Sequence, residues 1–176
     1  VLIIGPFNYP FQLLIEPLIG AIAAGNTVIL KPSEFTPNVS GVIQQIIADA
    51  FDPEYINIIQ GNADTTQTLL QFPFDYIFFT GSEQVGRVVY GAASKNLTPV
   101  TLELGGKSPA IIDESANIKV ASERICFGKF TNAGQTCVAP DYLLVNRKVK
   151  DELISALKKT ITEFYGTNIQ DSPDSV

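Results

Sequence analysis

Short apolar runs, separated by stretches with helical periodicity, constrain the fold of this 176-residue chain more than any other feature. Five such runs lie at residues 1–4, 27–30, 55–59, 75–80 and 99–103. The segments between them, at 11–24, 37–50, 65–71 and 83–95, carry helix-like patterns. Strands and helices that alternate at such intervals are typical of a parallel sheet covered by helices on both faces. We therefore expect an α/β fold.

The expected helices have recognisable ends. The segment 11–24 is apolar on nearly every side and stops before Gly25, a residue that is typical just past a helix C-terminus. Pro37 suits the start of the next helix, and Asp64 is the expected N-cap of the short helix at 65–71. No window reaches the roughly 18 uninterrupted apolar residues of a transmembrane helix, so we expect the helix at 11–24 to be buried.

The pattern changes after Thr98. Strands are expected at 109–112 and 142–146, and amphipathic helices at 118–130 and 149–165. We place a domain boundary after Leu102, which gives a first domain of residues 1–102 and a second α/β domain that begins at residue 103 and runs to 176. The chain has no methionine and opens within a strand, so we expect it to be part of a longer protein.

Composition argues against several classes of function. A net charge of −6 and a pI near 4.6 argue against a nucleic-acid partner, because phosphate binding needs clustered lysine and arginine. Two cysteines do not make a disulfide framework, which indicates a reducing compartment, and we expect a cytoplasmic protein. Without histidine, these residues cannot build a Cys-His pair, and we expect no metal site.

Cys137 is the obvious nucleophile in this sequence. Its loop contains Asn132, Gly134 and Gln135, which are small or polar. A thiol reacts as the thiolate, which backbone N–H groups, a helix N-terminus or nearby cations favour. Cys126 lies among apolar neighbours instead, and we expect it to be buried and inert.

Three further motifs follow expected strands, whose carboxyl ends line the ligand crevice in an open parallel sheet. The turn at 81–86 precedes a helix, whose N-terminus suits an anion. Lys31 and Glu34 suit the hydroxyls of a ribose, and Glu103, before a Gly-Gly pair, suits a general base. Taken singly, these motifs are explained as well or better by ordinary loops and a surface carboxylate. The turn at 81–86 also lacks the middle glycine of G-x-G-x-x-G.

Five sequence motifs in this order are more specific than any one of them. The motifs GPFNYP, GNTVILKPSE, FTGS, LELGGKSP and GQTCVAPDY together resemble the aldehyde dehydrogenase superfamily. LTPVTLELGGKSP and GQTCVAPDY are most similar to its class 3 branch, which includes fatty aldehyde and broad-specificity enzymes. The resemblance covers essentially the whole chain and implies a Rossmann-like, dinucleotide-binding first domain, followed by the start of a catalytic domain.

The resemblance also implies site residues. Cys137 matches the catalytic thiol, Glu103 the general base, and Asn8 the asparagine that stabilises the oxyanion together with the Cys137 N–H. The residues that match contacts to NAD or NADP are Lys31, Ser33, Glu34, Thr80, Gly81, Ser82, Val85, Leu104 and Gly105. Two positions depart from the family pattern: Phe7 replaces a tryptophan and Glu83 a threonine. The carboxylate of Glu83 either weakens pyrophosphate binding or points to solvent.

The activity implied by this resemblance is oxidation of a small-molecule aldehyde to a carboxylic acid by a homo-oligomer, expected to be a dimer. An enzyme that passes the acyl group to coenzyme A, and a non-catalytic protein that keeps the fold, are the alternatives. The choice between NAD and NADP stays open. We expect this piece by itself to be inactive, because the resemblance implies further site residues beyond it.

Overall fold

The computed structural model describes residues 1–168, and its contacts divide the chain into two compact units, Val1–Leu104 and Gly105–Val176. Each unit has its own hydrophobic core and is described by itself. The division falls after Leu104 rather than after Leu102, because Glu103 still belongs to the first sheet, where it pairs with Thr80.

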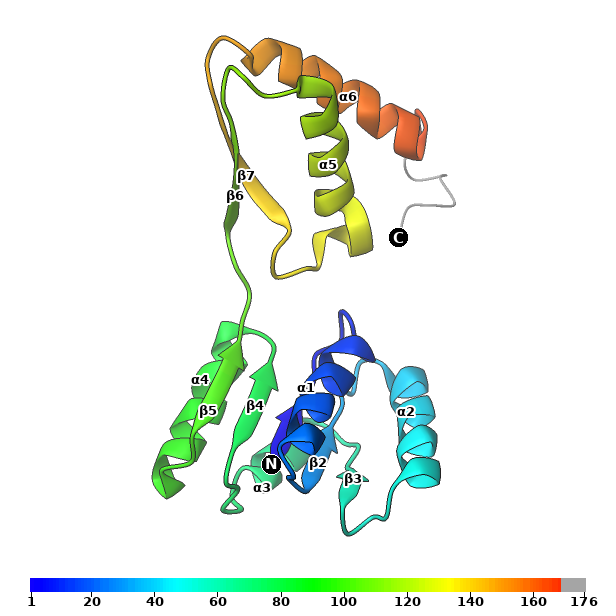
Figure 1. The fold of residues 1–176 in the computed structure, drawn as a ribbon, viewed down its shortest axis with the longest axis vertical. Helices are drawn as coiled ribbons and strands as arrows, with labels where there is room; N and C mark the ends of the chain where they lie inside the picture. The colour runs from blue at the N-terminus through cyan, green and yellow to red at the C-terminus, as the bar shows by residue number, and fades with distance from the viewer. Residues whose placement is uncertain (169–176) are drawn as a thin grey trace. The chain divides into compact units, whose positions relative to one another are not determined.

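The first unit contains a five-stranded sheet in which all neighbouring strands run parallel, in the order β3-β2-β1-β4-β5 (Figure 1). The strands are β1 (Leu2–Ile4), β2 (Val28–Lys31), β3 (Ile56–Ile58), β4 (Ile77–Thr80) and β5 (Val100–Glu103). Each coincides with one of the five apolar runs. The first strand lies in the centre, with β2 on one side and β4 on the other, so the direction in which strands are added reverses at β1.

Helices cover both faces of this sheet. They are α1 (Gln12–Ala23), α2 (Pro37–Ala50), α3 (Ala63–Leu69) and α4 (Glu83–Ala93), and α4 continues into a 3₁₀ turn at Ser94–Asn96. Successive side chains of a strand point to opposite faces. Ile3 accordingly packs with residues of α1 and α2, whereas Leu2 and Ile4 pack with residues of α3 and α4. The predicted Rossmann-like α/β fold is confirmed.

Two local predictions in the first unit are wrong. The N-cap of α3 is Asn62, whose side-chain oxygen accepts hydrogen bonds from the backbone N–H groups of Asp64 and Thr65. Asp64 therefore lies inside the first turn, where its negative charge still suits the helix N-terminus. Helix α1 is only half buried, since Leu14 and Leu18 face the sheet while Ile19 is 61% exposed.

Other features of the helices match the sequence. Gly25 follows α1 with a φ of 77°, as expected of a glycine just past a helix C-terminus. Pro37 is the first residue of α2. Within residues 1–168, none of the helices combines the length and the apolar character that crossing a membrane requires.

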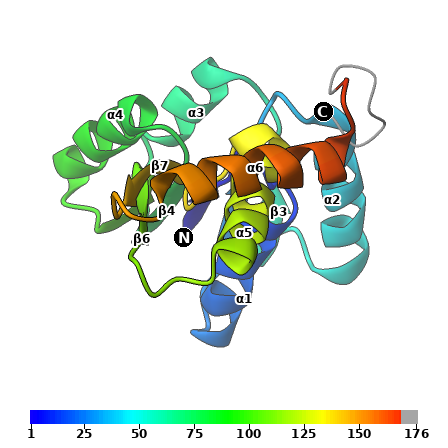
Figure 2. The same ribbon diagram turned by 90° about the horizontal axis from the view of Figure 1, so that it is seen from above.

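The second unit is a smaller α/β layer. A pair of parallel strands, β6 (Ser108–Ile112) and β7 (Pro140–Val145), packs against α5 (Ile118–Phe130) and α6 (Lys150–Tyr165). Figure 2 shows α6 running across α5. A buried hydrogen bond of 3.2 Å joins the hydroxyls of Ser122 on α5 and Thr160 on α6. A 3₁₀ turn, Thr131–Gly134, leads from α5 into the segment that carries Cys137.

Candidate active site

The predicted catalytic and cofactor residues of the first unit gather at one edge of its sheet, because parallel strands all end at the same edge. Asn8 follows β1, Lys31 ends β2, Thr80 ends β4 and Glu103 ends β5. Backbone hydrogen bonds tie the ends of neighbouring strands together, from Gly5 N to Lys31 O at 3.0 Å and from Gly81 N to Glu103 O at 2.9 Å. The edge includes the point where the strand order reverses, which is where ligands of open α/β sheets bind.

Lys31 is a buried cation at this edge, with only 2% of its surface exposed. Its Nζ donates to the carbonyl of Pro32 at 2.7 Å and lies 3.6 Å from Oε2 of Glu34. Burial lowers the pKa of Lys31, and the Glu34 carboxylate offsets that effect only in part. An ammonium group carries three donors, so the two acceptors within this segment leave one donor for a ligand. The geometry fits a ribose contact.

Ser33 stabilises the turn that holds Glu34. Its hydroxyl accepts from the N–H of Phe35 at 3.3 Å, and its carbonyl accepts from the hydroxyl of Ser40 at 3.2 Å. Both Ser33 and Ser40 are buried. The side chain of Ser33 therefore shapes the turn, while the half-exposed carboxylate of Glu34 is the part that faces outward.

The turn after β4 is built as a helix start. The hydroxyl of Ser82 accepts from the N–H of Val85 at 3.3 Å and caps α4. Gly81 is required by packing, because a Cβ there would lie 2.5 Å from the ring of Phe79. Glu83 is 67% exposed and pairs with Arg87 at 2.5 Å. Of the two outcomes expected for Glu83, the structure favours the one in which its carboxylate points to solvent.

Glu103 and Gly105 flank the point where the two units meet in sequence. Glu103 ends β5 with an exposed side chain. A Cβ built on Gly105 would meet nothing within 4 Å, so the backbone there is open to a flat ligand within its own unit. Leu104, between them, packs within the first unit, where its side chain lies 2.8 Å from a Cβ built on Gly86.

In the second unit, the segment that carries Cys137 has an unusual backbone. Asn132 and Ala133 adopt left-handed conformations with φ of 52° and 53°, and Gly134 follows with φ of 76°. A Cβ on Gly134 would lie 2.9 Å from the carbonyl of Lys129. Left-handed backbone is rare for residues other than glycine and is often found at functional sites. Cys137 itself is exposed.

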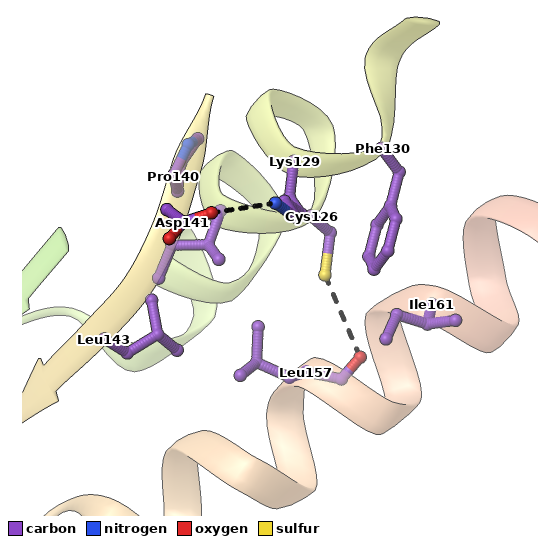
Figure 3. Close-up of a pocket in the computed structure, with 9 residues that line it drawn as sticks. Cys126, Lys129, Phe130, Pro140, Asp141, Leu143, Leu157 and Ile161 are labelled. Carbon is purple, nitrogen blue, oxygen red and sulfur yellow. Dashed lines mark hydrogen bonds and ion pairs between the residues drawn. The ribbon is translucent and has the colours of Figure 1, made fainter. Parts of the chain in front are cut away.

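Cys126 contrasts with Cys137, as predicted. It is fully buried on α5, and its thiol donates to the carbonyl of Leu157 on α6 at 3.9 Å (Figure 3). Burial raises the pKa of the Cys126 thiol, which disfavours the reactive thiolate. Cys126 is therefore a packing residue, and Cys137 is the accessible thiol.

One close contact of the Cys137 segment was missed from the sequence. A Cβ on Gly106 would lie only 2.8 Å from the carbonyl oxygen of Cys137. The second glycine of the Gly-Gly pair thus makes room for the Cys137 backbone rather than for a ligand. The Gly-Gly pair in the sequence signals a close approach of backbone, but it does not indicate which segment approaches Gly106.

The predicted residues divide between the two units. Asn8, Glu103 and eight of the nine predicted cofactor contacts lie in the first unit, and Cys137 and Gly105 lie in the second. The first unit brings its residues to one sheet edge, and the second brings Gly106 against Cys137. The individual roles of these residues stay predictions.

Comparison with known proteins identifies the family of this chain. A family model described as "Aldehyde dehydrogenase family" matches residues 1–174. The chain belongs to the aldehyde dehydrogenase family. The resemblance expected from the sequence is thereby confirmed, and several relatives are named as members of family 3.

The chain is 72% identical over 174 residues to 4,4'-diaponeurosporen-aldehyde dehydrogenase of Staphylococcus aureus, covering 99% of this chain and 38% of that protein. It is 49% identical to aldehyde dehydrogenase family 3 member A2 of Macaca fascicularis, covering 99% of this chain and 36% of the relative. The chain thus spans less than two-fifths of the length of these relatives.

Solved structures agree with the fold. The substrate-bound state of Staphylococcus aureus AldH matches with a TM-score of 0.93 at 71% identity, covering 99% of this chain and 38% of that one. A Mycobacterium tuberculosis aldehyde dehydrogenase complexed with NAD+ matches with a TM-score of 0.86 at 35% identity, covering 92% of this chain and 34% of that one.

Proposed function

We propose that this chain is the cofactor-binding part and the nucleophile-bearing part of a longer enzyme that oxidises an aldehyde to a carboxylic acid with NAD or NADP. Membership of the family over residues 1–174 carries the proposal. The exposure of Cys137 and the burial of Cys126 support it, because only one thiol is available for chemistry.

In the proposed mechanism, Cys137 attacks the aldehyde carbon and forms a thiohemiacetal. The side-chain amide of Asn8 and the backbone N–H of Cys137 stabilise the oxyanion, and losing one such donor typically costs about 2.7–4 kcal/mol of transition-state stabilisation. NAD or NADP, when bound, supplies the acceptor for the hydride. Cys137 then holds the substrate as a thioester, and Glu103 activates a water molecule that releases the acid.

We assign the cofactor to the carboxyl edge of the first sheet. Lys31 and Glu34, stabilised by Ser33, would hold the adenosine ribose, and the turn Thr80–Gly81–Ser82 with Val85 would lie along the pyrophosphate. Leu104 and the open backbone at Gly105 would lie along the nicotinamide. A relative described as NADP-preferring and one structure complexed with NAD+ support either cofactor.

We propose an apolar aldehyde as the substrate class. The relative at 72% identity is named 4,4'-diaponeurosporen-aldehyde dehydrogenase, and this name supports the proposal. We propose that kcat/KM rises with chain length from propanal to dodecanal, which steady-state NADH formation measures. A profile that is flat or falls with length would overturn this assignment of substrate class.

We propose that the longer enzyme is a cytoplasmic homodimer. A relative named "dimeric" supports a homodimer, and two free cysteines agree with a reducing, cytoplasmic location. Transfer of the acyl group to coenzyme A is the competing activity, because thiol transfer does not require a carboxylate base. A non-catalytic role is the other alternative, and it predicts no NADH formation at all.

The deciding experiment is Glu103→Gln in the full-length enzyme. We expect a burst of NADH equal to that of the wild type, followed by steady-state turnover lowered by at least about 10²-fold, since the thioester forms but is not hydrolysed. Glu114→Gln, at a surface ion pair of the second unit, is the matched control and should leave both phases unchanged. Unchanged steady-state turnover in Glu103→Gln would overturn the role of Glu103, and turnover that depends on added coenzyme A would favour the alternative.

A further inference from the structure

We propose that Asp141 is a positioning residue for the nucleophile, because its carboxylate ties together the two segments that press on the backbone around Cys137. This inference deepens the proposed function and rests on Cys137 as the catalytic thiol. Asp141 lies four residues after Cys137, at the start of β7.

Two lysines from different segments converge on one oxygen of Asp141. The Nζ of Lys107 lies 3.4 Å from Oδ1, and the Nζ of Lys129 lies 3.9 Å from the same atom. Lys107 precedes β6 and follows Gly106 directly, while Lys129 lies in the last turn of α5. Figure 3 shows Lys129 reaching from α5 toward Asp141 on β7. Asp141 is an exposed residue, with 32% of its side chain accessible to solvent.

Each lysine belongs to a segment in tight contact with the nucleophile loop, defined as residues 131–139. Gly106, next to Lys107, leaves only 2.8 Å between an added Cβ and the carbonyl of Cys137. The carbonyl of Lys129 lies 2.9 Å from a Cβ built on Gly134. Because these contacts involve backbone atoms, movement of either lysine segment is transmitted to the loop.

Side-chain packing alone does not fix the positions of Asp141 and Lys129. Both residues line a hollow of about 190 Å³ between α5, β7 and α6, whose walls include Ile125, Leu143 and Leu157 (Figure 3). Side chains beside an open hollow have fewer neighbours that fix their positions than side chains in a filled core. The charges therefore hold this end of the loop, where well-packed apolar side chains would otherwise do so.

The left-handed backbone at Asn132 and Ala133 makes such a tether useful. Residues in sparsely populated conformations keep them only where the surroundings hold them. The loop enters through these two residues and leaves at Ala139, which precedes β7 and Asp141. Asp141 thus fixes the exit of the loop to the segments that contact its entrance and its centre.

The test is Asp141→Asn in the full-length enzyme. We expect the NADH burst rate to fall about two- to tenfold, with KM for the cofactor within about twofold of the wild-type value, as for loss of partly exposed ion pairs that act on geometry. Asp141→Glu should recover most of the rate. Glu114→Gln is the control and should have no effect. It removes the ion pair between Glu114 and Lys148, whose sequence separation is similar to that of Lys107 and Asp141.

A double-mutant cycle separates the tether from general destabilisation. Lys107→Gln and Lys129→Gln should each slow the burst in the wild-type background and add nothing in the Asp141→Asn background. Additive effects, or a burst rate for Asp141→Asn within twofold of the Glu114→Gln control, would overturn the proposal. If Asp141→Asn fails to fold, the lysine variants test the proposal instead. A wild-type burst rate in the double variant Lys107→Gln/Lys129→Gln would refute the tether.

The rate at which iodoacetamide alkylates Cys137 keeps this test separate from the proposed function. If the wild-type enzyme forms no NADH, the proposed function fails. The alkylation rate, followed by mass spectrometry, must still change at least about threefold in Asp141→Asn and not in Glu114→Gln. An unchanged alkylation rate would refute the positioning role whatever the activity is.

Discussion

Replacing Gly106 by alanine tests how tightly the nucleophile loop is held. The new methyl group would lie 2.8 Å from the carbonyl oxygen of Cys137, whereas ordinary contacts begin near 3.4 Å. One of the two segments must therefore move by about 0.6 Å (3.4 − 2.8 = 0.6). The φ of Gly106 lies outside the left-handed region, so alanine itself is compatible with the local backbone and the effect is steric.

The size of the expected effect follows from the geometry of attack. A misplacement of about 1 Å in a catalytic group can cost about 10²-fold in rate. A shift of about 0.6 Å in the Cys137 backbone should then lower the rate of the NADH burst by roughly tenfold or somewhat more. The dissociation constant for the cofactor should change less than about threefold, because the atom nearest to the added methyl group is the carbonyl oxygen of Cys137.

Stopped-flow measurement of the NADH burst in the full-length enzyme provides the assay, with iodoacetamide labelling of Cys137 as a second readout. Gly105→Ala is the matched neighbour, since its methyl group would meet nothing within 4 Å in its own unit. We expect Gly105→Ala to leave the labelling rate unchanged and to weaken cofactor binding, the reverse of Gly106→Ala. If Gly106→Ala gives wild-type burst and labelling rates, the close contact does not position Cys137 and the reasoning fails.

Two further predictions concern stability. Asn62→Ala should lower the free energy of unfolding by about 1 kcal/mol through loss of the α3 cap, whereas Asp64→Ala should cost less; urea denaturation compares them, and a larger loss for Asp64→Ala would contradict the cap. Burial raises the pKa of Cys126 above its ordinary 9.0, so the unfolded thiol ionises first; the stability it contributes is complete below pH 9.0 and declines as pH rises above it. Cys126→Ala should remove this part of the pH dependence. If the free energy of unfolding changes equally with pH in both proteins from about pH 8 to 10.5, this contribution of Cys126 is refuted.

The first unit was predictable because local pattern and global topology agree there. Strands with residues such as Leu2, Ile3 and Ile4 are apolar on both faces, which only a sheet covered on both sides accommodates. The errors are local. Asn62 and Asp64 are both good cap residues, and the choice between them depends on where the backbone leaves its extended conformation. Apolar residues all around α1 did not reveal which side faces the sheet.

The structure around the candidate nucleophile could be predicted less fully from the sequence. The exposure of Cys137 and the burial of Cys126 followed from the polarity of their neighbours. The proximity of Gly106 to Cys137 did not, because the two are 31 positions apart (137 − 106 = 31) and no periodicity links them. The pairing of Asp141 with Lys107 depends on the register of β6 against β7, which a sequence pattern does not specify.

The central position of β1 has a consequence for how this chain is made. Leu2 pairs with Ile77 of β4, a separation of 75 positions (77 − 2 = 75). At about 5–20 residues per second, a ribosome takes roughly 4–15 s to supply β4 after β1. During that interval β1, β2 and β3 can assemble with α1 and α2, while the face of β1 that carries Leu2 and Ile4 waits for its partners. The edge of β1 therefore stays unpaired until β4 emerges, and the apolar face stays incompletely covered until α4 follows. This is the stage at which chaperones would bind the nascent sheet.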